Sequence, residues 1–351
     1  MYKKPCGVFD VNYVQDSALI RTGYRWIMLS VLFVLIFGAI PLFAGNYLRD
    51  VLINISIMVI AVIGLQIIIG FTGQISLGHA AFMAVGAYTS AMLSTHLGLS
   101  FWITMPLAAL LAGILGIVVS MPALRIRGFY VAVTTLAAHY IIMWAILHGG
   151  ELTKGVSGMS AAEIRIGGFA LDNELKFYYF AMLFAVLAVF FTSNLMRTKI
   201  GRAMLAVRDN DLAAEFMGIN VFKTKVLAFF LSAIYAGVAG SMLAHYQGMI
   251  TVDQFSLMDS IWMLAMLIVG GVTITGAIMG VFFIKILHQV VLFSAPVIGA
   301  IFPALAGSAV AAGMQIFFGA VIILFLIFEP RGLFHRWQIT LSTFRLWPFP
   351  Y

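Results

Sequence analysis

The chain has few charged residues, and this shortage defines its class. Only 9% of its 351 residues are Asp, Glu, Lys or Arg, whereas about 25% is usual in soluble domains. Hydrophobic residues make up 63%, against roughly 45–50% in a typical soluble protein. The composition therefore excludes an ordinary soluble domain and indicates a protein that crosses a membrane many times.

Cysteine and the common catalytic patterns are also scarce. Cys6 is the single cysteine, so no disulfide can form within the chain. The sequence contains no Gly-x-x-x-x-Gly-Lys-Ser/Thr pattern, which excludes nucleotide binding through a P-loop. Zinc-ligand spacing, a Ser/His/Asp set and a nucleophile elbow are missing as well. We therefore predict no catalytic residue and no metal site, and an intramembrane enzyme is only a third hypothesis.

Acidic residues are missing from the long apolar runs. All 13 of them fall in predicted tails, loops or span edges, although carriers driven by ions commonly keep carboxylates at membrane depth. An ion-coupled secondary carrier or channel thus remains as the alternative hypothesis, with Na⁺ sites built from carbonyls and hydroxyls still open. The polar residues within the spans are interpreted first as interhelical hydrogen-bonding groups; besides scattered Ser, Thr and Gln, they are His79, His139, His245, Lys285 and His288.

The apolar runs predict an all-α, polytopic helix bundle, because about 20 apolar residues cross the hydrocarbon core as a helix. Glycines in the third, eighth and ninth runs would also permit breaks or re-entrant segments, so the predicted range is eight to eleven crossings. We predict ten spans, at residues 27–44, 51–70, 76–95, 102–121, 128–147, 177–193, 226–247, 257–272, 277–294 and 308–328.

The distribution of Lys and Arg predicts the orientation. If both termini are cytoplasmic, 15 of the 20 basic residues fall on the cytoplasmic side, four fall outside and Lys285 lies in a span, as the positive-inside rule requires. The net charge of +7 is then a topology signal, and no nucleic-acid partner is expected. The predicted organisation is a cytoplasmic tail (1–26), a transmembrane domain (27–328) with a cytoplasmic loop (194–225) and an external loop (148–176), and a second cytoplasmic tail (329–351). We expect the first apolar run to remain as an anchor and not to be a cleaved signal.

One polar island, residues 197–225, interrupts the apolar runs. Its sequence predicts two short helices, Ala203–Val207 and Asp211–Met217, with Asp209 or Asn210 capping the second. Gly218 follows where a helix-ending glycine belongs. A helix of about two turns is unstable alone in water, so it leans on a membrane surface or enters a groove on a cytoplasmic partner.

The island resembles the cytoplasmic loop of permeases of branched-chain (hydrophobic) amino acid ABC importers, of the LivM-like type. The matching residues are Ile200–Ala203, Ala206–Arg208, Ala213-Ala214 and Gly218-Ile219. In such permeases this loop seats on the ATPase, and Leu212 stands where the broader importer motif has Glu. The resemblance implies an ATPase-coupling role for Gly201, Arg202, Arg208, Asp209, Asp211, Ala213, Ala214, Glu215 and Gly218.

A second stretch, Gly73–Phe82 followed by Gly86–Tyr88, is similar to the same family's G-Q-I-S-L-G-H-A-A-F…G-A-Y signature. Its small residues favour close helix packing, while its glycine-broken, polar start suits a solute path. Both interpretations stay open. The residues implied for the translocation path or for helix packing are Gly73, Gln74, Ser76, Gly78, His79, Gly86, Thr134, Gly270 and Gly271.

The resemblance implies the function of a permease subunit of an ABC importer in the bacterial cytoplasmic (inner) membrane. Its expected partners are a LivH-like permease, two cytoplasmic ATPase subunits, a periplasmic solute-binding protein and the lipid bilayer. No cofactor is expected on this chain, because ATP and Mg²⁺ would bind the ATPase subunits. The solute remains open between branched-chain amino acids, urea or amides, and aromatic or other carboxylates.

Overall fold

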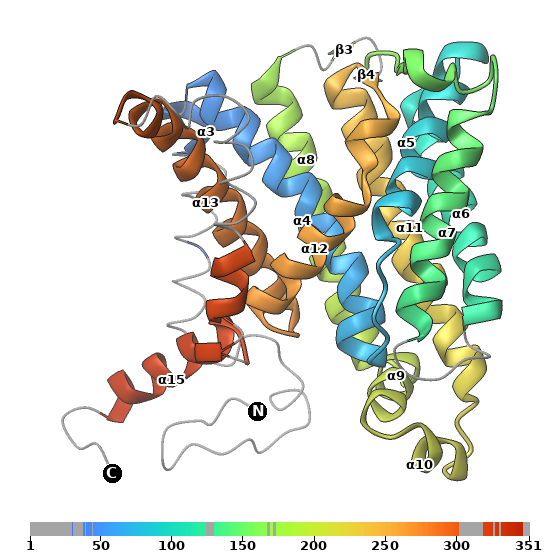
Figure 1. Cartoon of the computed structure of the whole chain (residues 1–351). Coiled ribbons are helices and arrows are strands. Elements are labelled where there is room, and N and C mark those ends of the chain that lie inside the picture. The colour runs from blue at the N-terminus through green and yellow to red at the C-terminus, as the bar shows by residue number, and fades with distance from the viewer. Residues whose placement is uncertain are drawn as a thin grey trace. The chain divides into compact units, whose positions relative to one another are not determined.

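The computed structural model describes residues 45–123, 130–166, 169–170, 173–301, 319–325, 327–329 and 331–346, together with residues 30, 38 and 40–43. The chain divides into two compact units, residues 1–50 and residues 51–351. The first contains the short helix α3 (Ile40–Phe43) and the start of α4. The helix bundle described below belongs to the second unit (Figure 1).

Helices dominate the described residues. The longer ones are α4 (Asn46–Thr72), α5 (His79–His96), α6 (Phe101–Ala123), α7 (Tyr130–Leu147), α8 (Glu174–Arg197), α9 (Lys199–Asp209), α11 (Val221–Gln247), α12 (Leu257–Gly270), α13 (Ile274–Ile301) and α15 (Leu333–Leu346). Shorter elements are α10 (Asp211–Phe216) and the 3₁₀ turns η2 (Gly155–Ser157) and η3 (Val252–Phe255). Two antiparallel pairs of two-residue strands complete the fold, β1 (Met159–Ser160) with β4 (Met249–Ile250) and β2 (Arg165–Ile166) with β3 (Phe169–Ala170).

Seven helical segments among the described residues are long and apolar enough to cross a membrane. They correspond to the predicted spans at 51–70, 102–121, 128–147, 177–193, 226–247, 257–272 and 277–294. Of the predicted span 27–44, 12 of 18 residues lie outside the described residues, as do 12 of the 21 residues of 308–328. The polytopic helix bundle is therefore confirmed, while the count of ten stays a prediction.

The helix predicted at 76–95 forms as α5, but it is not among those seven segments. It also starts inside the bundle. The His79 ring donates from Nε2 to the carbonyl of Ala61 on α4, at 2.8 Å, and Ala61 stands 11 residues before the last residue of α4. At 1.5 Å per residue the first residue of α5 lies about 16 Å back along α4. The six residues 73–78 span at most about 20 Å when extended, which is enough for this return, and Figure 1 shows them as an extended strand of chain beside the helices.

The core is built around α4. In its apolar 18-residue stretch 78% of the residues are buried, whereas the corresponding share in α13 is 28%. Next to it, α5, α6 and α11 approach one another closely because small residues line their contacts. Gly86 on α5 faces Gly237 on α11, and Ser241 donates its hydroxyl to the carbonyl of Gly86 at 3.2 Å. Gly86 therefore lies in a helix-packing contact.

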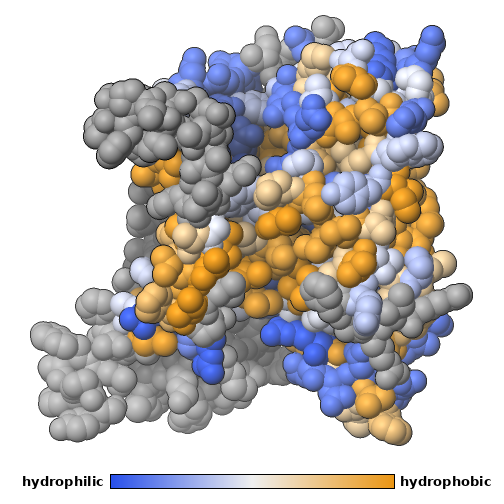
Figure 2. Space-filling view, in the orientation of Figure 1, coloured by the Kyte–Doolittle hydropathy of each residue, from blue (hydrophilic) through white to orange (hydrophobic). Residues whose placement is uncertain are grey.

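Several contacts join distant segments that the charge pattern assigns to the same face. On the predicted outer face, β1 from the external loop pairs with β4, and Thr95 donates its hydroxyl to the carbonyl of Ser160 at 2.7 Å. On the predicted inner face, Gly332 lies against the backbone of Gly271. On the face shown in Figure 2, hydrophilic residues gather at the two ends and hydrophobic residues lie between them.

The two predicted tails are described unequally. Residues 1–26 lie outside the described residues. In the predicted tail 329–351, α15 forms a helix that contacts α12 and α13. Glu329 and Arg336 make an ion pair at 3.1 Å across the start of this helix.

Candidate functional site

The polar island folds into the helical hairpin α9–α10. α9 begins after Thr198, whose hydroxyl accepts a hydrogen bond from the amide of Gly201 at 3.3 Å. Met204 and Val207 of α9 are buried, and Met204 packs in a cluster with Ile67 and Phe71 of α4. The predicted first helix, Ala203–Val207, was thus too short, because the cap at Thr198 adds a full turn before it.

The second helix agrees closely with its prediction. Of the two proposed caps, Asn210 is the one used, and its Oδ1 accepts from the amide of Ala213 at 3.1 Å. Gly218 has a φ of +81°, in the left-handed region that glycine adopts without strain. Its amide bonds the carbonyl of Glu215, and the next amide bonds that of Ala214, which is the Schellman arrangement of a helix end.

The hairpin divides its side chains between an inner and an outer side. Ala214 is only 4% exposed and Gly201 is buried, whereas Arg202, Asp209, Ala213 and Glu215 are exposed. Three large apolar residues also point outward, Leu212 (55% exposed), Phe216 (91%) and Met217 (83%). We call these three residues the docking surface. Hydrophobic colour accordingly reappears at the lower tip of the molecule, over α10, in Figure 2.

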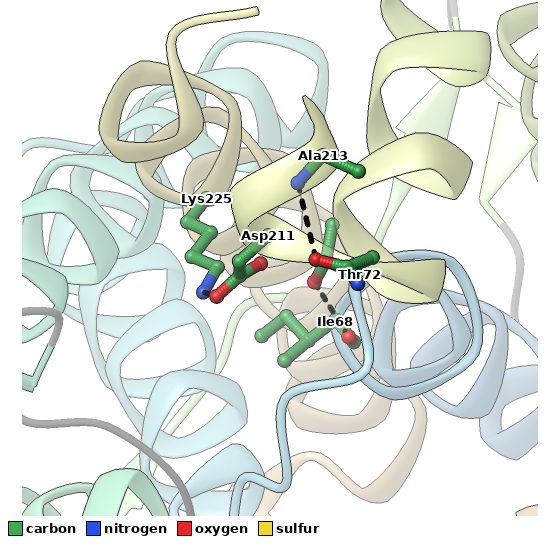
Figure 3. A network of polar contacts seen from close by, with 6 residues as sticks. Ile68, Thr72, Asp211, Ala213 and Lys225 are labelled. Atoms are coloured by element: carbon green, nitrogen blue, oxygen red, sulfur yellow. Dashed lines mark hydrogen bonds and ion pairs between the residues drawn. The ribbon is translucent and has the colours of Figure 1, made fainter. Parts of the chain in front are cut away.

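An ion pair holds α10 to the following helix. Lys225 of α11 donates from Nζ to Oδ2 of Asp211 at 2.5 Å. Figure 3 shows this pair next to the end of α4, where Thr72 donates its hydroxyl to the carbonyl of Ile68. Asp211, predicted as part of an ATPase-coupling loop, therefore has a contact within its own chain.

Residues 73–78, which we call the broken segment, run between α4 and α5. Gly73 has a φ of +70°. A Cβ on Gly78 would lie 2.4 Å from the carbonyl oxygen of Thr135 on α7, so only glycine fits between the two backbones. The hydroxyl of Thr135 accepts from the amide of Leu77 at 3.0 Å.

The start of α5 is fixed to three other helices. His79 bonds α4, as described above, and Ser260 of α12 accepts from the amide of Ala80 at 2.9 Å. Thr135 of α7 accepts a hydrogen bond from the amide of Leu77, two residues before α5 begins. The side chains of Gln74, Ser76 and His79 are all buried. This level of the bundle therefore joins α4, α5, α7 and α12.

The structure groups the predicted path residues into separate contacts. Gly73, Gln74, Ser76, Gly78 and His79 lie in or directly after the broken segment, whereas Gly86 lies in the α5–α11 contact. The Thr134 hydroxyl bonds the carbonyl of Tyr130 in its own helix, and its neighbour Thr135 makes the contact with the broken segment. Gly270 and Gly271 pack at the turn between α12 and α13, against Gly276 and Gly332.

Two residues at this site were missed as site residues from sequence. Thr135 directly follows the predicted site residue Thr134, and the sequence did not distinguish the two. Ser260 carried no signal, because its partner Ala80 is 180 residues away in the chain. Among the described residues, no group of three or more His, Cys, Asp or Glu could hold a metal ion.

The family described as "Branched-chain amino acid transport system / permease component" matches residues 47–326. The chain belongs to this family. It is 31% identical over 280 residues to the high-affinity branched-chain amino acid transport system permease protein LivM of Escherichia coli, covering 73% of this chain and 65% of that protein. It is 30% identical over 308 residues to LivM of Salmonella typhimurium, covering 81% and 69%.

A more distant relative is named for a different solute. The ribose import permease protein RbsC of Haemophilus influenzae is 27% identical over 202 residues, covering 56% of this chain and 60% of that protein. No solved structure matches the chain. The relatives of this chain thus have names that refer to different solutes.

Proposed function

We propose that this chain is a membrane permease subunit of an ABC importer, located in the bacterial inner membrane. Its family consists of transport permeases and not of enzymes, and the relatives named above are a transport system permease and an import permease. The apolar helices supply the membrane domain that this role requires. An ion-coupled carrier is not favoured by these relatives.

The observation that supports this proposal best is the docking surface. Phe216 and Met217 are almost fully exposed at the tip of a hairpin, on the face that the positive-inside rule assigns to the cytoplasm. Exposed apolar patches mark sites of protein association. Since the chain has no P-loop, the partner that fits this surface is a cytoplasmic ATPase subunit that binds ATP and Mg²⁺.

The remaining partners are proposed from the same family. A second, LivH-like permease would complete the membrane domain, and a periplasmic solute-binding protein would deliver the solute. The external loop 148–176 is a candidate surface for that binding protein, since β1–β4 pairing and the bond from His245 Nδ1 to the carbonyl of Ala162, at 2.6 Å, hold it on the bundle. We take branched-chain amino acids as the first solutes to assay, with other small polar solutes next.

The test is co-purification of the tagged chain from native membranes in mild detergent. We expect a second permease and ATPase subunits to be recovered with the wild-type chain. Phe216→Asp places a charge in the docking surface and should release the ATPase subunits while the second permease remains. Ala214 is a poorer target because it is buried within the hairpin, so a bulky residue there would disturb the chain's own fold.

The matched control is Val156→Asp, which charges another highly exposed apolar residue (84%) on the opposite, external loop. It should retain the ATPase subunits at the wild-type level. A wild-type chain that purifies alone and transports unaided after reconstitution would contradict the proposal and favour a carrier or channel.

A further inference from the structure

The inner end of α4 is bonded by a residue from the polar island. Arg208, in the last turn of α9, donates from Nη1 to the carbonyl of Gly70 at 2.6 Å, across 138 residues of sequence. Gly70 belongs to the final turn of α4, where carbonyls have no partner within the helix. The negative end of the helix dipole also attracts a guanidinium. Arg208 therefore acts as a cap on α4 supplied by another helix.

Arg208 also lies against the first residue of the broken segment. A Cβ on Gly73 would be 3.4 Å from Cγ of Arg208 and 3.7 Å from its Cα. Arg208 thus lies beside Gly73, at the distance where an added methyl group would just make ordinary van der Waals contact. The two sequence motifs that were recognised separately, around residues 73–82 and 200–219, meet at this one arginine.

The docking surface and Arg208 belong to one braced unit. Only Asn210 separates α9 from α10, and its side chain caps α10. The Asp211–Lys225 pair ties the start of α10 to α11, and Ala214 packs inward. We therefore expect a displacement of α10 to move Arg208 with it.

The broken segment is the part suited to respond. Its backbone lacks the ladder of a helix, and it holds buried polar atoms that have no hydrogen-bond partner within the part of the chain that the structure describes: the Gln74 amide and the Ser76 hydroxyl. Nδ1 of His79, the first residue of α5, also has no hydrogen-bond partner among the described residues. Burying such groups unpaired is unfavourable, so an arrangement in which they gain a hydrogen-bond partner would relieve this cost.

We propose that Arg208 transmits movement of the docking surface to the broken segment, and through it to the start of α5. This inference rests on the proposed function, because an ATPase must supply the movement. Arg208 is a positioning residue. It pulls on the Gly70 carbonyl and on Gly73, and the bond between Ala80 and Ser260 passes the shift to α12.

The experiment follows the broken segment directly and needs no known solute. Cys6 is the single cysteine, so a Cys6→Ser chain carrying Ile75→Cys has one thiol, at a position that is 41% exposed. The complete complex with its ATPase subunits is reacted with a hydrophilic maleimide, with and without a non-hydrolysable ATP analogue and Mg²⁺. We expect the nucleotide to change the labelling rate at least threefold.

Arg208→Met removes the donor and the charge but keeps a long side chain. The nucleotide-dependent change in labelling should disappear, while the ATPase subunits stay bound and continue to hydrolyse ATP. Arg208→Lys, which retains a cation at the end of α4, should restore part of the change. Lys199→Met removes a charge from the same helix at an exposed position. In the Cys6→Ser, Ile75→Cys chain it should leave the nucleotide-dependent change in labelling as it is.

Each other result overturns the inference. An unchanged response in Arg208→Met would show that the movement takes another route, and loss of the ATPase subunits would assign Arg208 to docking. A complex that retains its ATPases but shows no nucleotide response at Ile75→Cys would refute the inference and leave the proposed function standing. Absence of ATPases from the unmodified complex would refute the proposed function itself.

Discussion

The contact between α5 and α11 depends on the absence of a side chain at Gly86. A Cβ at this position would lie 2.3 Å from the carbonyl oxygen of Gly237 and 2.4 Å from its Cα. Both are backbone atoms, so no rotation of a side chain relieves the clash. Gly86→Ala must therefore force the two helices apart until the contact exceeds 3.0 Å, and this separation also stretches the bond from Ser241 to the Gly86 carbonyl.

The expected loss of stability follows from these two effects. Overpacking a close contact destabilises a protein by typically about 1–3 kcal/mol, and an interhelical hydrogen bond in a membrane contributes on average about 0.6 kcal/mol. Because the clash involves backbone on both sides, we expect Gly86→Ala to lower the free energy of unfolding by about 2–3 kcal/mol. That corresponds to a roughly 30- to 140-fold change in the unfolding equilibrium constant.

The assay is unfolding of the purified chain by titration with SDS in mixed micelles, followed by the fluorescence of its six tryptophans. Gly319→Ala is the matched control, since a Cβ there meets no atom of the described residues within 4 Å, and it should change the free energy of unfolding by less than about 0.5 kcal/mol. If Gly86→Ala unfolds at the same SDS concentration as the control and the wild type, the helices α5 and α11 do not approach as closely as described.

Three further predictions concern the site and its supports. Thr135→Val removes the acceptor for the Leu77 amide and should lower the free energy of SDS unfolding by about 1–3 kcal/mol. Thr134→Val should change it little, because the Thr134 hydroxyl bonds a carbonyl of its own helix, and equal effects of the two variants would contradict the assignment. Asn210→Ala removes the cap of α10 at about 1 kcal/mol, so hydrogen exchange should speed up in α10 and not in α11. Gly332→Ala adds a Cβ 2.5 Å from backbone atoms and strains a φ of +80°, so limited proteolysis should cut the chain faster before α15 than in the wild type.

Much of the bundle was predictable because membrane thickness fixes the length of an apolar helix. The predicted span 102–121 corresponds to α6 at Phe101–Ala123, and 128–147 corresponds to α7 at Tyr130–Leu147. The starting level of α5 was not predictable in this way. Gly73 and Gly78 indicated a break, but the return of residues 73–78 along α4 depends on tertiary bonds to Ala61 and Thr135.

The direction of Arg208 shows most clearly where sequence reasoning ends. An arginine in a cytoplasmic loop satisfies the positive-inside rule wherever its side chain points, and the family pattern suggested a residue that serves a partner. The rule requires only a charge, whereas the carbonyl of Gly70 requires a donor at a particular place and direction. Other cations in the same loop, such as Lys199 and Lys223, are exposed, as Arg208 is, and already supply charge. Arg208 is distinguished from them by its geometry, which explains why exchanging it for methionine should alter the response of the broken segment when the same exchange at Lys199 does not.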